Sequence, residues 1–438
     1  MPSIEQFSSE YRAKSCTAKE AVADLPADSM VVFGTGLSEA QQLLWALATR
    51  LRDGNLEKLR VFCGPPGFYS TDSLCAPDIS PQVSRVSQFV GPTERENIKA
   101  MRVSYLPHQF HQIPRLIAET MDVDLAFTTV SPMDESGHFS LGTNNDFING
   151  ALRSAKQVIV EVNENMPRVH GDAHVHLSEV SAIVENHVPL PPVEHVPGGP
   201  EDEKIAARIA ELVPNGATIQ AGSGVLPGMV CKALENHRDL GIHTELLVPG
   251  ILDLVRSGAA NGSMKTEKRG KHVYTLIVGD KDDLAFVHDN PDFESHPVSY
   301  TNLPAVIARN DRMISINAAL EVDLTGQVNA EHLGGYQFSG AGGQVDFVRG
   351  AYDSKDGKSI LAFHSTARKG SASRIVPVLP EGTIVTTPRA DTHYIVTEFG
   401  VANLKGKSVK DRALAIIELA HPNFRDELRR ASTDLGLV

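Results

Sequence analysis

The chain has 438 residues, of which 41% are hydrophobic and 22% charged, and its formal net charge is −13. This length exceeds what one hydrophobic core usually serves, so two domains of roughly 200 residues each are expected. The net negative charge excludes a protein that binds nucleic acid or an anionic membrane surface, because such proteins need a basic face.

The four cysteines are scattered without any CxxC spacing, so neither a disulfide framework nor a thiolate metal site is predicted. The sequence does not open with the basic segment and apolar run of a signal peptide. Its apolar stretches are far shorter than the roughly 20 residues that a membrane-spanning helix needs. A reducing cytoplasm is therefore the expected location.

The first half of the chain alternates short apolar runs with amphipathic segments. A strand at Met30–Phe33 is followed by the turn Gly34-Thr-Gly36 and by a helical pattern from Glu39 to Leu51. Further buried strands are predicted at Leu59–Phe62, Leu125–Val130 and Gln157–Val162. This order of strands and helices is typical of a parallel α/β sheet.

A proline-rich stretch divides the chain. Residues 188–200 contain five prolines, which remove backbone donors and interrupt regular pairing. We therefore expect an N-terminal α/β domain over residues 1–187, a linker at 188–200 and a C-terminal α/β domain over residues 201–438.

The second half shows the same alternation of strands and helices, with a glycine turn between a strand and a helix. A helix at Glu201–Leu212 and a strand at Ala217–Ala221 lead to Gly222-Ser-Gly224, after which a helix is predicted from Pro227. Small residues between a strand and a helix let backbone amides approach an anionic or polar ligand, although a tight packing turn gives the same pattern. Pro227 replaces the third glycine of GxGxxG, so the dinucleotide-binding fingerprint is absent. The stretch Gly400–Ser408 likewise has the wrong spacing for a P-loop.

Glu245 stands out in the segment Leu240–Val255, which predicts a short strand, a turn and a helix. It lies at the carboxyl end of the strand, where open α/β sheets bind their ligands. Two interpretations stay open at this point: a carboxylate beside a ligand held by the glycine turn, or a solvated loop glutamate.

A second glycine cluster lies between apolar strands further along the chain. Its five glycines fall within ten residues, at Gly334, Gly335, Gly340, Gly342 and Gly343. Such density allows close backbone approach to a ligand and could form an oxyanion hole, and the alternative is a long hairpin loop. Downstream, Lys358 opens a strand and could meet a phosphate or face water.

The histidines do not form a recognisable metal or hydrolase motif. Neighbouring histidines occur at His108, His111, His170, His174 and His176. None has an HExxH spacing, so no metal site is predicted. A serine hydrolase of the GxSxG type is not indicated either, because the serine after Gly222 comes one residue too early.

Several of these segments together resemble the acetyl-CoA hydrolase/transferase family, and the 4-hydroxybutyrate CoA-transferases within it most closely. The resemblance rests on the GSG turn, Gly241–Glu245, Ser339–Phe347, Val130–Gly142, Asn163–Arg168 and Val396–Leu404, and so extends over nearly the whole chain.

The resemblance implies two tandem open α/β domains of the CoA-transferase type with the active site at their interface, and a homodimer. It implies Glu245 as the nucleophile of a ping-pong reaction through a glutamyl-CoA thioester. CoA or acyl-CoA would be a substrate, with no permanently bound cofactor. The implied CoA-lining residues are Gly222, Ser223, Gly224, Val225 and Leu226, together with thioester contacts at Gly342 and Gly343 or alternatively Gly335 or Gly340, and Lys358 near CoA.

The chemistry suits a glutamate. With an ordinary pKa of about 4.3 it is ionised at neutral pH and can attack a thioester without a separate base. The alternatives are an acyl-CoA hydrolase on the same fold and a non-catalytic CoA-binding regulatory protein. Acetate, butyrate, 4-hydroxybutyrate and short dicarboxylates all fit as acids, and loops such as Gly64–Ser70 or His138–Asn144 are expected to select among them.

Overall fold

The computed structural model describes residues 4–193, 197–222 and 224–438, and the chain forms two compact units. The first unit consists of Met1–Val193 and Tyr274–Tyr300, and the second of Glu194–Val273 and Thr301–Val438. The segment Tyr274–Tyr300 therefore belongs to the first unit, although a division at the proline-rich stretch assigns it to the second domain.

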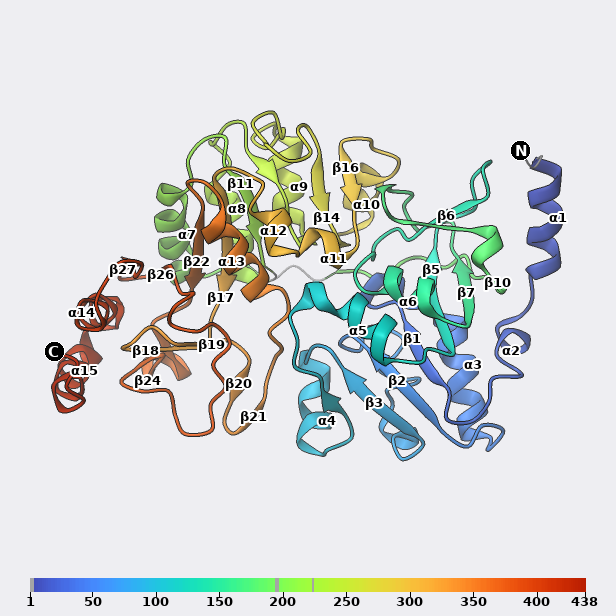
Figure 1. Cartoon of the computed structure of the whole chain (residues 1–438), viewed down its shortest axis with the longest axis horizontal. Helices are drawn as coiled ribbons and strands as arrows, with labels where there is room; N and C mark the ends of the chain where they lie inside the picture. Colours follow the sequence, from blue (N-terminus) through green and yellow to red (C-terminus); the bar gives the residue numbers. More distant parts are fainter. Residues whose placement is uncertain (1–3, 194–196, 223) are drawn as a thin grey trace. The chain divides into compact units, whose positions relative to one another are not determined.

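A seven-stranded parallel sheet forms the centre of the first unit, in the order β10-β7-β5-β1-β2-β3-β4 (Figure 1). Its strands are β1 (Met30–Phe33), β2 (Leu59–Cys63), β3 (Val83–Ser87), β4 (Ser104–Tyr105), β5 (Leu125–Val130), β7 (Gln157–Val162) and β10 (Ala182–Glu185). Val31 and Phe33 join one apolar cluster and Val32 joins another, because successive side chains of a strand face opposite sides of the sheet. The sheet is therefore covered on both faces.

The helices of the first unit contribute to both clusters, with Leu43 and Leu44 on one face and Ile113 and Ile148 on the other. They are α1 (Ile4–Lys14), α2 (Ala18–Ala21), α3 (Gln41–Arg52), α4 (Arg95–Lys99), α5 (Ile113–Thr120), α6 (Ile148–Ser154) and α10 (Lys281–Val287). Short strands complete the unit at β6 (His138–Ser140), β8 (His170–Gly171), β9 (His174–His176), β15 (Leu276–Ile277) and β16 (Phe293–Ser295).

The second unit is built on a six-stranded sheet in the order β12-β11-β17-β22-β26-β27, in which only β27 runs antiparallel to its neighbour. The strands are β11 (Thr218–Ala221), β12 (Gly241–Ile242), β17 (Met313–Ala318), β22 (Lys358–Ala362), β26 (Tyr394–Thr397) and β27 (Gly400–Asn403). The helices beside them are α7 (Pro200–Leu212), α8 (Val225–Ala233), α9 (Pro249–Arg256), α12 (Pro304–Ile307) and α13 (Gln344–Asp353). Five neighbouring strands thus present their carboxyl ends along one edge of the sheet.

Smaller elements surround that sheet. They are β13 (Leu246–Leu247), β18 (Glu321–Asp323), β19 (Val328–Asn329), β20 (His332–Leu333), β21 (Tyr336–Gln337), β23 (Thr366–Ala367), β24 (Ala372–Ser373) and β25 (Ile375–Val376). Strand β14 (His272–Tyr274) and helix α11 (Val298–Thr301) lie where the chain passes from one unit to the other.

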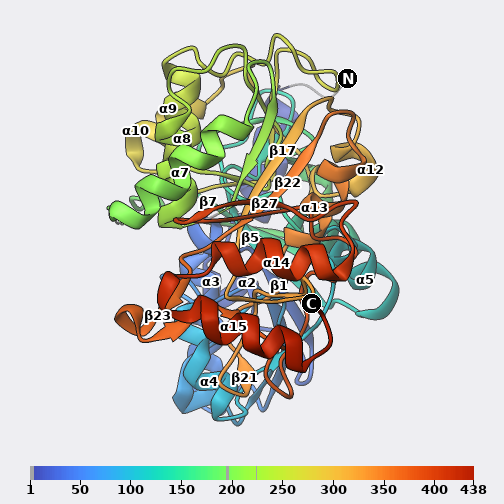
Figure 2. The same cartoon turned by 90° about the vertical axis from the view of Figure 1, so that its left-hand side faces the viewer.

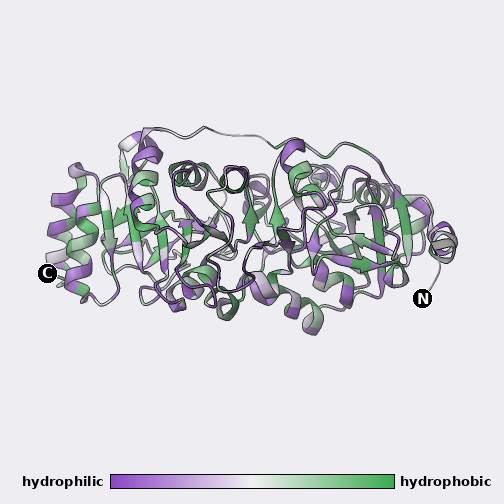
Figure 3. Cartoon of the chain, turned by 90° about the horizontal axis from the view of Figure 1, so that it is seen from above, coloured by the Kyte–Doolittle hydropathy of each residue, from purple (hydrophilic) through white to green (hydrophobic). Residues whose placement is uncertain are grey.

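Two amphipathic helices end the chain. Helices α14 (Val409–Leu419) and α15 (Pro422–Asp434) lie side by side, as Figure 2 shows. Ile416, Ile417 and Leu428 face the core while Lys410 and Arg429 are exposed, and Figure 3 shows the corresponding hydrophobic and hydrophilic stretches. Across the residues that the structure describes, we find no helix with the length and apolar character to cross a membrane.

Candidate active site

Glu245 follows strand β12 at the carboxyl edge of the second unit's sheet. β12 pairs in parallel with β11, with Thr218 opposite Gly241. The residues between the strand and the glutamate are fully buried. The Nε2 of His243 donates a 2.8 Å hydrogen bond to the Thr301 carbonyl, and the Thr244 hydroxyl donates to the Leu246 carbonyl. Glu245 itself is half-buried. Its backbone is thus held by the core while its side chain reaches the surface of the unit.

The carboxylate of Glu245 is fixed by two close neighbours. The side-chain amide of Asn302, which is fully buried, donates a hydrogen bond of 2.6 Å to Oε2. Gly343 lies so close that a Cβ atom built there would stand 1.9 Å from the same oxygen and 2.2 Å from the Asn302 amide nitrogen. Only glycine fits at position 343 with this arrangement. Glu245 is therefore not a solvated loop side chain.

Gly343 is also the N-cap of helix α13. Gly342 before it has a left-handed φ of 51°, and the amide of Gln344 closes the turn on the Ala341 carbonyl. The side chain of Gln344 donates to the Ala318 carbonyl at 2.7 Å, which attaches the start of the helix to the end of β17. A helix N-terminus carries partial positive charge and unsatisfied N–H groups. The carboxylate of Glu245 thus lies where an anion is favoured.

The predicted glycine turn occupies the same edge of the sheet. Gly222 follows β11, its amide donates to the Ile316 carbonyl at 3.0 Å, and a Cβ atom there would stand 3.3 Å from Oδ1 of Asn317. Gly224 is exposed with φ of 110° and precedes α8, whose first turn contains the half-buried Val225 and Leu226. Ser223, the remaining predicted residue of this turn, lies outside the described residues. Because β11 and β12 are adjacent, the described part of the turn and Glu245 share one edge.

The other predicted glycines are distributed differently. Gly334 and Gly335 form the exposed tip of the β20–β21 hairpin, with φ values of 64° and 86°. Their left-handed backbone conformation is a sufficient reason for glycine at both positions. Gly340 is buried between this hairpin and α13. The structure therefore brings Gly343 to Glu245 and places Gly335 in a turn.

Lys358 lies at the opposite edge of the sheet. It opens β22, which runs parallel to β17 and β11, so its position is at the amino end of the strand. Its ammonium group donates to the Leu212 carbonyl at 2.6 Å, where it satisfies the last turn of α7. Lys358 thus lies at the edge of the sheet opposite to Glu245, and its expected contact with CoA stays a prediction.

Three histidines of the first unit, His138, His174 and His176, lie on the short strands β6 and β9. His138 pairs with His176 across β6 and β9, and its ring lies 4.8 Å from that of His176 and 6.4 Å from that of His174. Burial, and then the charges of Arg168 and His138, lower the pKa of His174. Within the described residues, no group of three or more potential ligands is arranged to hold a metal ion.

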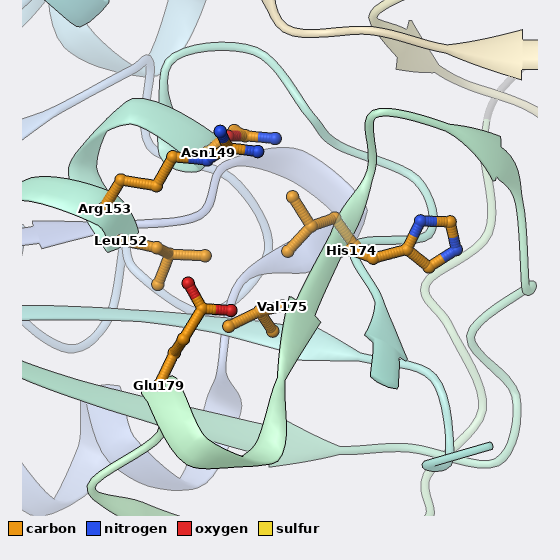
Figure 4. A pocket seen from close by; sticks show the side chains of 7 residues that line it. Asn149, Leu152, Arg153, His174, Val175 and Glu179 are labelled. Carbon is orange, nitrogen blue, oxygen red and sulfur yellow. The ribbon is translucent and has the colours of Figure 1, made fainter. Parts of the chain in front are cut away.

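A small pocket is lined in part by His174. Glu179 points into it between Leu152 and Val175, whereas the ring of His174 turns away (Figure 4). The pocket contains no carboxylate with the glycine and amide neighbours seen at Glu245. We therefore take the edge around Glu245, and not this pocket, as the candidate active site.

Sequence reasoning missed the two asparagines of the site. Asn302 is 57 residues from Glu245 and lies in a short connection before α12, with no local pattern that marks it. Asn317 exchanges side-chain hydrogen bonds with Gln220 across β17 and β11, which fixes the amide beside Gly222. The Asn317 contact follows from strand order and the Asn302 contact from the path of the connection before α12, so both join residues far apart in the sequence.

The comparisons with known proteins decide the family. Residues 2–194 match the acetyl-CoA hydrolase/transferase N-terminal domain, and residues 279–432 match the C-terminal domain of the same family. The chain belongs to the acetyl-CoA hydrolase/transferase family. The expected family and the expected α/β fold with parallel sheets are thereby confirmed.

The similarity to known proteins extends over almost the whole chain. It is 42% identical to the succinyl-CoA:cyclohexane-1-carboxylate CoA transferase of Geobacter metallireducens, over 99% of this chain and 98% of that protein. It is 41% identical to the 4-hydroxybutyrate coenzyme A transferase of Clostridium kluyveri, over 95% of this chain and 97% of that protein. The crystal structure of RipA from Yersinia pestis superposes with a TM-score of 0.95 and 47% identity, covering 99% of this chain and 100% of that one. The predicted class of enzyme, a CoA-transferase, is confirmed by these relatives.

Proposed function

We propose that this enzyme moves CoA between an acyl-CoA and a free carboxylic acid through a glutamyl-CoA thioester on Glu245. The observation that carries the proposal is the position of the Glu245 carboxylate, held by Asn302 and packed on Gly343 at the start of α13. An ionised carboxylate in a fixed position, next to helix N–H groups that lack intrahelical partners, is suited to attack a thioester.

In the first half-reaction a Glu245 oxygen attacks the thioester carbonyl carbon. The tetrahedral intermediate collapses with cleavage of the carbon–sulfur bond, which gives a mixed acyl-glutamyl anhydride and CoA thiolate. The thiolate then attacks the glutamyl carbonyl carbon, and the acyl group leaves as a carboxylate. Glu245 now carries CoA as a thioester, and no proton has been gained or lost.

The second half-reaction runs the same steps in reverse with a different acid. The incoming carboxylate attacks the glutamyl thioester and releases CoA thiolate, which then attacks the acyl carbonyl of the new anhydride. A new acyl-CoA forms and Glu245 returns as a carboxylate. Carboxylates are weak nucleophiles, so stabilisation of each oxyanion by backbone donors is expected to lower the barrier by about 3–4 kcal/mol.

The acids that we propose are short carboxylates. The relatives are named for succinyl-CoA with cyclohexane-1-carboxylate, for 4-hydroxybutyrate, and for butyryl-CoA with acetate. We propose acetate, butyrate and 4-hydroxybutyrate as the first acceptors to test, followed by short dicarboxylates.

The direct test is product analysis with butyryl-CoA in the presence and absence of acetate. The proposal predicts acetyl-CoA and butyrate in equal amounts, formed only when acetate is present, with parallel lines in double-reciprocal plots. Release of free CoA at the same rate without any acceptor acid would instead identify a hydrolase. A protein that binds CoA but forms neither product with any acid tested would contradict both activities.

A further inference from the structure

His243 is a buried histidine close to Glu245 in the sequence, and the reaction steps proposed above do not use it. Its amide donates to the Ile219 carbonyl at 3.2 Å, which continues the pairing of β12 with β11. The ammonium group of Lys265, itself buried, donates to the carbonyl of the preceding Ile242 at 2.8 Å. The backbone that carries the His243 ring is therefore fixed.

The ring of His243 packs against helix α13. Its centroid lies 6.4 Å from that of Phe347 and the two ring planes meet at 60°, which is an edge-to-face arrangement. Phe347 is buried one turn into α13, where its amide donates to the Gly343 carbonyl at 3.1 Å. Because both rings are enclosed, the imidazole has little freedom to turn.

The Nε2 atom of His243 faces the connection before α12. It donates to the carbonyl of the buried Thr301 at 2.8 Å, and a carbonyl can only accept, so this nitrogen carries the proton. The next residue along the chain is Asn302, whose amide donates to Oε2 of Glu245 at 2.6 Å. The carbonyl that His243 holds thus belongs to the peptide group that leads into Asn302.

The side-chain amide of Asn302 needs such a support from the main chain. Its oxygen, Oδ1, is buried and accepts no hydrogen bond from any residue that the structure describes. The amide is therefore held through its nitrogen, on the side of Glu245, and a turned amide would set two acceptor oxygens against each other. Where the nitrogen lies depends on the position of the backbone at Asn302.

We propose that His243 is a positioning residue for the transfer reaction. Its hydrogen bond to the Thr301 carbonyl fixes the peptide group before Asn302, and so keeps the Asn302 amide on the carboxylate of Glu245. A peptide group is planar, so holding its oxygen also places its nitrogen, which belongs to Asn302. In this role His243 contacts neither the thioester nor the acid. The inference rests on the proposed function, because it concerns the nucleophile assigned there.

The test compares His243→Asn with His243→Gln in steady-state transfer from butyryl-CoA to acetate. The glutamine nitrogen is as far along its side chain as Nε2 of histidine, so the donor is kept, whereas the asparagine nitrogen is one bond short. His243→Asn should lower kcat about tenfold through displacement of the Asn302 amide, with KM within about twofold of wild type. His243→Gln should keep kcat within about threefold of wild type.

His237→Asn is the matched control. The Nε2 atom of His237 also donates to a backbone carbonyl, that of Val213 at 3.0 Å, in the same unit and before the amino end of β11. Loss of this bond should lower the Tm by a few degrees and leave kcat unchanged. If His243→Asn likewise lowers the Tm and leaves kcat unchanged, His243 has no positioning role and the inference is wrong.

A double-mutant cycle with Asn302→Ala tests the route of the effect. Once the amide is removed, adding His243→Asn should change kcat by less than about twofold. A further loss of about tenfold in the double variant would overturn the inference, because His243 would then act independently of Asn302.

His243→Gln decides the question should His243→Asn fail to fold. A folded His243→Gln enzyme that loses as much kcat as Asn302→Ala would overturn the inference, since the donor is still present. Failure of the proposed function would appear separately, as normal turnover in Glu245→Gln, whatever the result at His243.

Discussion

Each unit has a glutamate at the carboxyl edge of its parallel sheet, and the two glutamates differ in burial and in their hydrogen-bond donors. Glu39 follows β1 in the first unit and is 2% exposed. Its oxygens accept from the amides of Gly67 at 2.8 Å and Tyr69 at 2.7 Å and from the amide and hydroxyl of Ser70. Glu245 is half-buried, accepts from the side-chain amide of Asn302 and lies against Gly343.

Burial and the number of donors are the two differences between Glu39 and Glu245, and we propose that they separate a structural carboxylate from a reactive one. The donors around Glu39 hold the loop that contains Gly67–Ser70, and burial raises the pKa of the carboxyl despite them. A carboxylate enclosed in this way cannot reach a substrate. Glu245 keeps an approach from the surface of its unit, and the glycine at 343 brings the helix N-terminus close to it.

The largest expected effect separates these two glutamates directly. Glu245→Gln should reduce transfer by about a thousandfold or more, because the amide cannot form the anhydride, while CoA binding and the Tm stay near wild type. Glu245→Asp should lose about a hundredfold through withdrawal of the attacking oxygen. Steady-state transfer between butyryl-CoA and acetate measures both.

Glu39→Gln is the contrasting variant. It replaces one accepting oxygen by a donor facing backbone amides, so it should lower the Tm by several degrees and keep the transfer reaction. Normal turnover in Glu245→Gln, or loss of turnover with an unchanged Tm in Glu39→Gln, would reverse the roles that we give to the two carboxylates.

Gly343→Ala is expected to have the next largest effect. The new methyl group would overlap Oε2 of Glu245 and the Asn302 amide, so the nucleophile must move. A displacement of about 1 Å costs about a hundredfold in kcat. Gly334→Ala, at the exposed hairpin tip with φ of 64°, should strain the turn and leave kcat unchanged. Equal kcat values in the two variants would show that position 343 does not constrain Glu245.

Asn302→Asp should give a smaller loss with a characteristic pH dependence. It places a second carboxyl group at hydrogen-bond distance from Glu245, and two such groups share a proton, which raises the pKa of the pair. Transfer at neutral pH should fall about tenfold, and the rising limb of the pH–rate profile should move to higher pH. An unshifted profile would mean that Asn302 does not contact the reacting carboxylate.

Asp146 in the first unit tests how a buried carboxyl group affects stability. Burial raises its pKa to about 7, so the folded chain holds a proton that the unfolded chain releases at lower pH. The stabilisation is complete below the ordinary aspartate pKa and is lost as the pH rises toward 7, by about 2 kcal/mol between about pH 5 and about pH 7. Thermal unfolding at the two pH values should show this loss for wild type, and a shallower one for Asp146→Asn.

The smallest effect is expected at the amino edge of the second unit's sheet. Lys358→Met removes the hydrogen bond to the last turn of α7 and should cost about 1 kcal/mol of stability. KM for butyryl-CoA should stay within about twofold of wild type, because a side chain that does not contact butyryl-CoA contributes nothing to its binding. A large rise in KM would return Lys358 to the CoA site.

The strands were the most predictable part of the fold. β1, β5 and β7 begin and end at the expected residues, because continuous apolar runs bounded by turns define buried parallel strands. Helix α8 begins at Val225, two residues before the expected Pro227, because Gly224 serves as its N-cap. The grouping of Tyr274–Tyr300 with the first unit could not be predicted, since it depends on contacts between segments more than a hundred residues apart.

The site was only partly accessible from the sequence. Glu245 and the glycine turn are adjacent because their strands are neighbours, which the general rule for open α/β sheets anticipates. That rule does not say which of five clustered glycines touches the carboxylate, and it does not point to Asn302. Lys358 opens β22 at its amino end and so lies at the edge opposite to Glu245, and its contact with CoA stays a prediction.

The central claim is that Glu245 becomes covalently bound to CoA during turnover. The most direct measurement is peptide mass spectrometry of the enzyme quenched in acid after incubation with butyryl-CoA and no acceptor. The account predicts a CoA adduct on the peptide that contains Glu245, removed on adding acetate and absent from Glu245→Gln. An adduct on another residue, or full exchange activity in Glu245→Gln, would contradict it.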